Sequence, residues 1–204
     1  MSITGLFLML FLLVHLTANI TSLFGAELFD EVCAFMGANP VILVMTPVLA
    51  AGFILHILYA LWLSLYNLKA RGHKGYAVSN KGPATSWAAK NMLILGAVVA
   101  GALVLHLVHF WSRMQLQEFL GGAGVRPYDL LVYTFSKVYV VIIYVVWIIA
   151  LWFHLTHGFW SAFQSLGLNN KKWMSRWQTI AYVYASLVAF GFISIPLYFY
   201  LFVA

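Results

Sequence analysis

Six histidines lie inside long apolar stretches of this sequence, where a titratable side chain is costly and usually serves a function. They are His15, His56, His106, His109, His154 and His157. No Asp, Glu or Lys lies near the middle of any of these stretches. A proton relay or an ion-coupled transporter normally needs carboxylates there, whereas two neutral imidazoles are enough to fill the axial positions of a haem iron. The residue types therefore indicate haem ligation.

The stretches that carry the histidines are long enough to cross a bilayer. Apolar residues make up 64% of the chain and charged residues 8%, against about 25% charged residues in a soluble domain. A run of about 20 apolar residues spans the hydrocarbon core, and five such runs occur, at 3–24, 41–68, 91–116, 129–165 and 178–203. The sequence predicts an all-α integral membrane bundle of five transmembrane helices. The fourth run is long enough to extend beyond the bilayer, and residues 1–204 form a single membrane-embedded domain.

The charged residues predict the orientation of the bundle. Two loops are basic, and they contain Lys69, Arg71, Lys74, Lys81 and Lys90 in one case and Lys171, Lys172 and Arg176 in the other. The opposite side holds every acid in the chain: Glu27, Asp30, Glu31, Glu118 and Asp129. Because cytoplasmic loops are enriched in Lys and Arg, we expect a cytoplasmic N-terminus and a C-terminus outside. No positive charge precedes the first run, which is longer than a signal-peptide core, so we expect a retained helix.

The depth of the histidines sorts four of them into two pairs. His15 and His106 lie past the middle of helices that run outward, and both therefore lie near the outer face. His56 and His154 lie past the middle of helices that run inward, each roughly 18–20 Å from the inner end of its helix. Two bis-imidazole haems stacked across the membrane, an outer one on His15/His106 and an inner one on His56/His154, would produce this pattern.

His109 competes with His106 for the outer role, and His157 competes with His154 for the inner one. A flat macrocycle against a helix favours a ligand with small residues one turn away. Such residues are Gly52 and Ala60 for His56, Ala102 for His106, and Ala150 and Gly158 for His154. This spacing favours His106 and His154, while His15 is favoured by depth alone. Three roles are left for His109 and His157: hydrogen-bond donors to haem propionates, residues of a quinone pocket, or packed side chains.

Three segments resemble a known family. They are T-G-L-F-L-M-L-F-L-L-V-H-L (4–16), V-L-H-L-V-H-F-W (104–111) and F-H-L-T-H-G-F-W-S-A-F-Q-S-L-G (153–167). They resemble the cytochrome b subunit of succinate dehydrogenase/fumarate reductase, in its single-chain, five-helix, two-haem type, and the likeness extends over essentially the whole chain. The resemblance supports the first His of H-L-T-H-G as a ligand and implies the same two pairs of iron ligands.

The resemblance also implies the surroundings of the chain. It implies an anchor in a bacterial cytoplasmic (inner) membrane, with a flavoprotein (FAD) subunit and an iron–sulfur subunit on the cytoplasmic face. Electrons would pass between succinate/fumarate and a quinone, with menaquinone the expected one, and the succinate chemistry would take place on the other subunits. No catalytic residue and no nucleic-acid partner are expected in this chain, which contacts lipid and is compatible with a dimer of complexes.

Polar residues near the two faces are candidates for quinone and propionate contacts. Oxidation of a hydroquinone releases protons, so a carboxylate near the outer haem is useful. The candidates are Glu27, Asp30 and Glu31, for which a solvated outer loop is the other interpretation. Propionates need donors or cations. Arg113 and Lys137 are candidates for the outer haem, and Ser64, Lys69 and Lys90 for the inner haem.

The single cysteine, Cys33, can form no internal disulfide, and it is expected as a small, half-buried residue of the first outer loop. The chain contains no C-x-x-C-H segment, so a haem here would not be attached as in a c-type cytochrome.

Three other functions compete with this interpretation. The first is another quinone-reactive cytochrome b anchor, such as that of a hydrogenase, formate dehydrogenase or nitrate reductase, which tends to place two ligands on one helix. The second is a transporter or metal permease, which predicts broken helices or acids within the bundle. The third is a structural anchor without haem, for which the matched depths of the histidines would be an accident.

Overall fold

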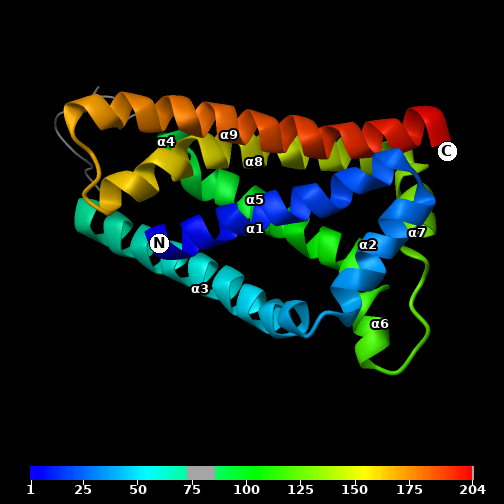
Figure 1. The fold of residues 1–204 in the computed structure, drawn as a ribbon. Coiled ribbons are helices and arrows are strands. Elements are labelled where there is room, and N and C mark those ends of the chain that lie inside the picture. Colours follow the sequence, from blue (N-terminus) through cyan, green and yellow to red (C-terminus); the bar gives the residue numbers. More distant parts are fainter. Residues whose placement is uncertain (73–85, 204) are drawn as a thin grey trace.

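The computed structural model describes residues 1–72 and 86–203, and this part of the chain contains helices and no strands (Figure 1). Five of its helices are long and apolar enough to cross a membrane: Ser2–Phe24, Pro40–Arg71, Met92–Trp111, Val138–Ser165 and Lys171–Val203. The prediction of an all-α chain with five spans is confirmed, and the bounds of the spans differ from the expected ones. The chain is a multi-pass membrane protein by the length and composition of these helices.

Each span begins with an α-helix, and three of the five end in a short turn of another type. The five α-helices are α1 (Ser2–Ile20), α3 (Pro40–Arg71), α5 (Met92–His106), α8 (Val138–Ser165) and α9 (Lys171–Tyr198). The end turns are the 3₁₀ turn η1 (Thr21–Phe24) after α1 and the π turns η3 (Leu107–Trp111) after α5 and η4 (Phe199–Val203) after α9. Shorter helices cover the ends of the bundle: α2 (Ala26–Ala38), α4 (Trp87–Lys90), α6 (Gln115–Phe119) and α7 (Pro127–Phe135).

The expected fourth run, 129–165, is two helices rather than one. The chain leaves α7 at Ser136 and passes through extended backbone at Lys137 (φ −99°, ψ 109°) before α8 begins. The side of α7 that packs on the core is buried through Leu131 and Phe135. The apolar run was therefore too long because it joined a short end helix to the span that follows it.

The expected fifth span, 178–203, begins seven residues earlier, at Lys171. The side chain of Asn170 accepts hydrogen bonds from the backbone N–H groups of Lys172 and Trp173, at 3.1 and 2.9 Å. This is the contact of an N-cap residue, which satisfies amides that have no partner inside the helix. The hydropathy run missed this turn because Lys171, Lys172 and Arg176 make it polar.

The acidic segment after the first span is a helix and not a loop, and Glu27 and Glu31 on it are exposed, as the interpretation of solvated acids expects. Glu27, Asp30 and Glu31 lie on α2, whose Phe29 is buried in the core. Glu27 stands in the first turn, where a carboxylate is favourable near the helix N-terminus. Cys33 is also on α2 and half-buried, so its burial is as expected and its placement in a loop was wrong.

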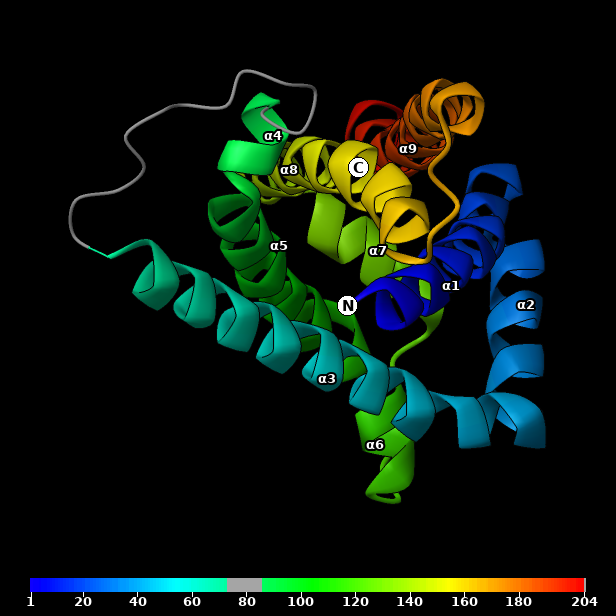
Figure 2. The same ribbon diagram turned by 90° about the vertical axis from the view of Figure 1, so that its left-hand side faces the viewer.

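The core of the bundle lies between α8, α9 and α1. Ala181, Ala185 and Val188 of α9 have no exposed surface, and small side chains of this kind let membrane helices approach closely. Met9 of α1 and Leu155 of α8 form one cluster with Ala185 and Val188. A second cluster, at the α2–α7 end, joins α2, α7, α8 and α9. Helix α3 stands at the side of this core (Figure 2), and Gly52 is its one buried residue.

The two ends of the bundle differ in charge. One end carries cations from the end of α3, from α4 and from the start of α9: Lys69, Arg71, Lys90, Lys171, Lys172 and Arg176. The other end, formed by α2, α6 and α7, carries Glu27, Asp30, Glu31, Glu118 and Asp129 (Figure 1). Lys74 and Lys81, which entered the orientation argument, lie outside the described residues.

Candidate functional site

The structure brings His15 of α1 next to His106 of α5, at the level expected for the outer pair. The centroids of the two rings are 5.7 Å apart and the ring planes cross at 87°. Phe11 stacks on His15 at 5.1 Å, and Trp147 lies 5.6 Å from His106. A π turn begins directly after His106, and such turns are frequent at functional sites.

The structure likewise brings His56 of α3 next to His154 of α8. Their ring centroids are 6.4 Å apart and the planes cross at 67°. A glycine of a neighbouring helix lies beside each ring. A Cβ on Gly5 would be 3.7 Å from Cε1 of His56, and a Cβ on Gly96 would be 3.7 Å from Cε1 of His154. Both rings therefore lie against helix surfaces where there is no side chain.

Two helices give the distance between the two pairs along the bundle. On α1, Thr4 contacts His56 and lies eleven residues before His15, which corresponds to about 16 Å of helix. On α5, Gly96 lies beside His154 and ten residues before His106, which corresponds to about 15 Å. The two pairs therefore occupy two separate levels of the bundle, and each pair joins two different helices.

The separation of the rings can be compared with what a shared metal ion requires. Two imidazoles bound through nitrogen at about 2.0–2.1 Å on opposite sides of one ion have their centroids about 6.3 Å apart. The observed separations are 5.7 and 6.4 Å. Nδ1 is buried without a hydrogen-bond partner among the described residues in His106, in His154 and equally in His157, so the fit rests on the separation and pairing of the rings. The donor set fits a bis-imidazole haem iron at each level.

Comparison of the chain with protein-family models, with curated proteins and with solved structures finds no match. The described residues contain no group of three or more His, Cys, Asp or Glu side chains that could hold a metal ion. Each candidate site is thus a pair of imidazoles, and haem is a group that needs only two protein ligands.

The two histidines that remained open have partners outside the two pairs. Nδ1 of His109 lies 3.1 Å from the hydroxyl of Tyr144, and the two rings stack with centroids 5.9 Å apart. The ring of His157 packs on the edge of Trp160 at 4.9 Å, with its Nδ1 buried and unbonded. His109 and His157 therefore have other neighbours in the described structure, whereas His106 and His154 each face a second imidazole.

The small residues one turn from the ligands do not all play the expected part. A Cβ on Gly52 would lie 2.8 Å from Cε1 of Phe7, so Gly52 serves the close approach of α3 and α1 rather than a flat group. A Cβ on Gly158 would lie 3.5 Å from the methyl group of Met92. The glycines that meet the imidazoles come from other helices, which a search along one helix cannot find.

The two cations proposed for the outer haem both lie beside the ring of Tyr133. Nζ of Lys137 lies 3.8 Å from the ring centroid of Tyr133, and the guanidinium of Arg113 lies 5.7 Å from it. Lys137, by hydrogen bonding and by its charge, and then Arg113, by its charge, lower the pKa of the Tyr133 phenol. Arg113 is seven residues beyond His106, just after the π turn η3. Both cations thus lie at the end of the bundle that carries α2, α6 and α7, and their contact with a haem propionate stays a prediction.

The residues proposed for the inner haem lie at different distances from its level. Ser64 is eight residues after His56 on α3, about 12 Å of helix, and Lys69 is thirteen residues after it, about 20 Å. Lys90 is six residues before Gly96, about 9 Å along the axis. Ser64 is half-buried and both lysines are exposed. Lys69 is the most distant of the three and therefore the weakest candidate.

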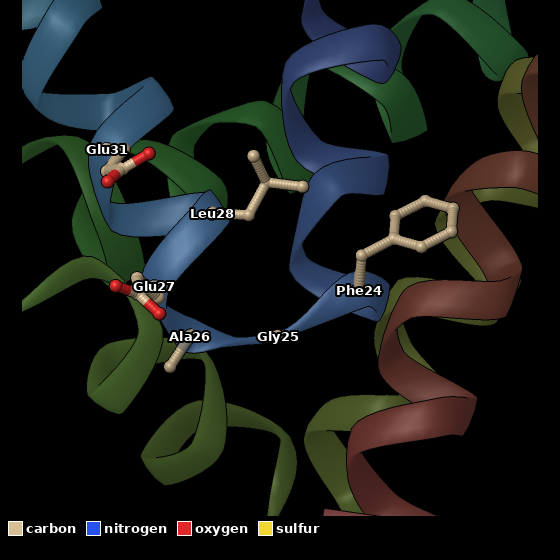
Figure 3. A pocket seen from close by; sticks show the side chains of 6 residues that line it. All are labelled: Phe24, Gly25, Ala26, Glu27, Leu28 and Glu31. Carbon is tan, nitrogen blue, oxygen red and sulfur yellow. The ribbon is translucent and has the colours of Figure 1, made fainter.

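The three carboxylates proposed for quinone chemistry fall into two groups. Asp30 forms a salt bridge with Arg126 and accepts a hydrogen bond from the backbone N–H of Tyr128 at 3.0 Å. Glu27 and Glu31, one turn apart on α2, line an open pocket of about 450 Å³ together with Phe24 and Leu28 (Figure 3). Asp30 therefore joins α2 to the start of α7, and it also lines, with Glu27, Glu31 and Arg126, an adjoining open pocket of about 680 Å³.

The contacts of three polar residues with the imidazoles were not predicted from the sequence. Thr4 contacts His56, Asn19 contacts His15 at 3.4 Å, and Tyr144 contacts His109. The spacing of Asn19, four residues after His15, was a usable signal because residues at i and i+4 are neighbours on a helix. Thr4 and Tyr144 act on another helix, and no spacing within the chain indicates such a contact.

Proposed function

We propose that this chain is the cytochrome b membrane subunit of a succinate:quinone oxidoreductase, that is, of a succinate dehydrogenase or fumarate reductase. The observation that carries the proposal is the pairing of four histidines at two levels of a membrane bundle. In this proposal His15 and His106 hold an outer haem b, and His56 and His154 hold an inner haem b. The choice of a succinate enzyme among quinone-reactive cytochromes rests on the resemblance of segments 4–16, 104–111 and 153–167.

Four neutral imidazoles suit this role in an apolar bundle. They add no charge to the hydrocarbon region, where an uncompensated ion is expensive. When bound, each haem supplies a one-electron carrier, and the two levels supply a path along the bundle. The residues of the chain hold the two positions, and the aromatic side chains Phe11 and Trp147 keep the outer pair in an apolar environment.

The pocket on α2 provides proton chemistry at the acidic end. Oxidation of a hydroquinone releases two protons and two electrons, and its reverse takes them up. In this proposal Glu27 and Glu31 exchange those protons with the quinone, while the apolar side chains Phe24 and Leu28 contact its ring. Asp30 is held by Arg126 and keeps α2 in place. Menaquinone is the expected quinone from the resemblance.

The charge asymmetry supports an orientation for the complex. The cationic end, with the ends of α3 and α4 and the start of α9, faces the cytoplasm of a bacterial inner membrane by the positive-inside rule. The N-terminus is then cytoplasmic and the C-terminus outside. The flavoprotein and iron–sulfur subunits dock at this cationic end, and the quinone pocket lies at the opposite face.

The test is the haem content and spectrum of the purified, detergent-extracted chain. We expect about two b-type haems per chain in a pyridine haemochrome assay and low-spin bands in the reduced-minus-oxidised spectrum. Folded protein without haem would refute the proposal. Two haems, without succinate-dependent quinone reduction when the chain is purified from native membranes with its partners, would assign it to another quinone-reactive complex.

A further inference from the structure

The inner histidine pair is anchored by Thr4 of α1. The hydroxyl group of Thr4 donates a hydrogen bond to the carbonyl oxygen of Met1 at 2.9 Å, and its oxygen lies 3.1 Å from Nδ1 of His56. A hydroxyl has one proton to donate, and here that proton goes to Met1. The same oxygen can at the same time accept from Nδ1–H of His56. In that tautomer Nε2 keeps its lone pair.

We propose that Thr4 is a positioning residue for His56, which holds this imidazole in the tautomer and orientation that bind the iron of the inner haem through Nε2. The inference rests on the proposed function. A ligating histidine normally donates its second ring N–H to an oxygen acceptor, and this bond raises the basicity of the ligand. Thr4 supplies that acceptor from a different helix.

This arrangement is confined to one of the four rings. Nδ1 of His106 and Nδ1 of His154 are buried without a partner. Nδ1 of His15 lies 3.4 Å from an amide nitrogen of Asn19, which already donates to a backbone oxygen at 2.8 Å. Within residues 1–72 and 86–203, His56 is thus the one member of the two pairs with a hydroxyl acceptor at Nδ1. Removing that acceptor should change the inner haem and leave the outer haem as it is.

The geometry of α1 makes the contact available. Thr4 and His15 are eleven residues apart, which is close to three full turns, so both side chains lie on one face of the helix. Gly5, next to Thr4, lies beside the imidazole of His56, where a Cβ would be in ordinary van der Waals contact at 3.7 Å from Cε1. The same face of α1 therefore carries a ligand for the outer level and an anchor for the inner level.

The test is a redox titration of the full chain in detergent, followed in the haem bands, with haem per chain measured on the same samples. Thr4→Val removes the hydroxyl and keeps the shape, and Thr4→Ser keeps the hydroxyl. Thr17→Val is the matched control on the same helix, because the Thr17 hydroxyl is bonded only to the backbone oxygen of Leu13, at 2.9 Å, and the residue is exposed.

We expect Thr4→Val to raise the midpoint potential of one haem only, because a less basic ligand stabilises ferric iron less. A threefold to tenfold change in the ratio of reduced to oxidised inner haem corresponds to about 30–59 mV. Thr4→Ser and Thr17→Val should titrate like the wild type. Selective loss of one haem in Thr4→Val, with retention in Thr4→Ser, also supports the proposal.

Two results would overturn the role of Thr4. One is two haems with unchanged potentials in Thr4→Val, and the other is an equal effect of Thr4→Val with Thr17→Val or with Thr4→Ser. A wild-type chain without haem is a different result, because it refutes the proposed function itself and with it the reason for the anchor.

Discussion

In the proposed two-haem chain, adding one methyl group at Gly52 should selectively remove the inner haem. A Cβ there would lie 2.8 Å from Cε1 and 3.1 Å from Cδ1 of Phe7, whereas carbon atoms in contact prefer about 3.5–4.0 Å. Helix α3 or the Phe7 ring must therefore move by about 0.7–1.2 Å. His56 lies four residues further along α3, about 6 Å, so a movement of α3 is carried to the inner pair.

The expected loss of haem follows from the separation of the two imidazole rings of the inner pair. The centroids of His56 and His154 are 6.4 Å apart, and two ligands of one ion need about 6.3 Å. A displacement of α3 by most of an ångström would stretch one of the two bonds between an imidazole and the proposed inner haem iron beyond its normal length. We expect Gly52→Ala to bind about one haem per chain in place of two, and to be destabilised by about 1–3 kcal/mol through overpacking.

The assay is haem per chain by pyridine haemochrome, together with the midpoint of thermal unfolding in the same detergent. Gly101→Ala is the matched control, because a Cβ at Gly101 meets nothing within 4 Å. A second change, Phe7→Leu, should restore part of the haem in the Gly52→Ala background. Two haems with wild-type potentials in Gly52→Ala would refute the link between the α1–α3 contact and the inner pair.

Three further predictions concern the ligands, the thiol and the acidic end. His154→Ala should lose one haem and His157→Ala should keep both, measured as haem per chain, and the reverse result would exchange their roles. Burial first, and the charge of Asp30 second, raises the pKa of Cys33 from 9.0 to about 11. At pH 8 the thiolate is therefore about a hundredfold scarcer than in an ordinary thiol, and alkylation by iodoacetamide should accelerate only as the pH approaches 11; a midpoint near 9 would contradict this. By linkage, the folded state holds this proton where the unfolded state has lost it, so stability should fall as the pH rises from about 9 to 11. Asp30→Ala should lower stability by about 0.5–1.5 kcal/mol because the backbone N–H of Tyr128 loses its acceptor, with little contribution from the exposed Arg126, while the exposed Glu31→Ala should stay within about 0.5 kcal/mol. Equal thermal midpoints for the two variants would argue against a stabilising contact between Asp30 and the start of α7.

The number of spans and the juxtaposition of the histidines were accessible from the sequence for a simple reason. A bilayer fixes the length of an apolar helix, and alternation of direction fixes the relative depth of residues on successive helices. Depth therefore paired His15 with the level of His106 and His109, and His56 with the level of His154 and His157, and the small residues one turn away favoured His106 and His154. Which of two neighbouring histidines faces the partner is a matter of rotation about the helix axis, and the wider π turn after His106 alters that rotation.

Breaks between helices were harder to predict because hydropathy averages over them. The run at 129–165 contains one interruption, Lys137, at the point where the backbone becomes extended. A single lysine at the end of an apolar segment is compatible with a span that continues, since its long side chain reaches the interface. The start of α9 had a clearer signal in Asn170, a strong N-cap residue, which a search for apolar runs does not use.

Contacts between helices could not be predicted at all from spacing. The acceptor at His56 comes from Thr4, fifty-two residues earlier, and the glycine beside His154 comes from α5. Such contacts depend on how far each helix is rotated and how closely the backbones approach. These quantities are set by packing, for example by Gly191, where a Cβ would lie 2.8 Å from both methyl groups of Leu16.

The weak burial of α3 bears on how the protein is made. The two core clusters are built by α1, α2, α7, α8 and α9, and Gly52 is the one buried residue of α3. The clusters that hold the bundle together can therefore form while α3 is still at a distance. In the proposed two-haem chain, a bundle assembled in this order would have His154 in place before α3 supplies His56, so binding of the inner haem would be linked to the docking of α3.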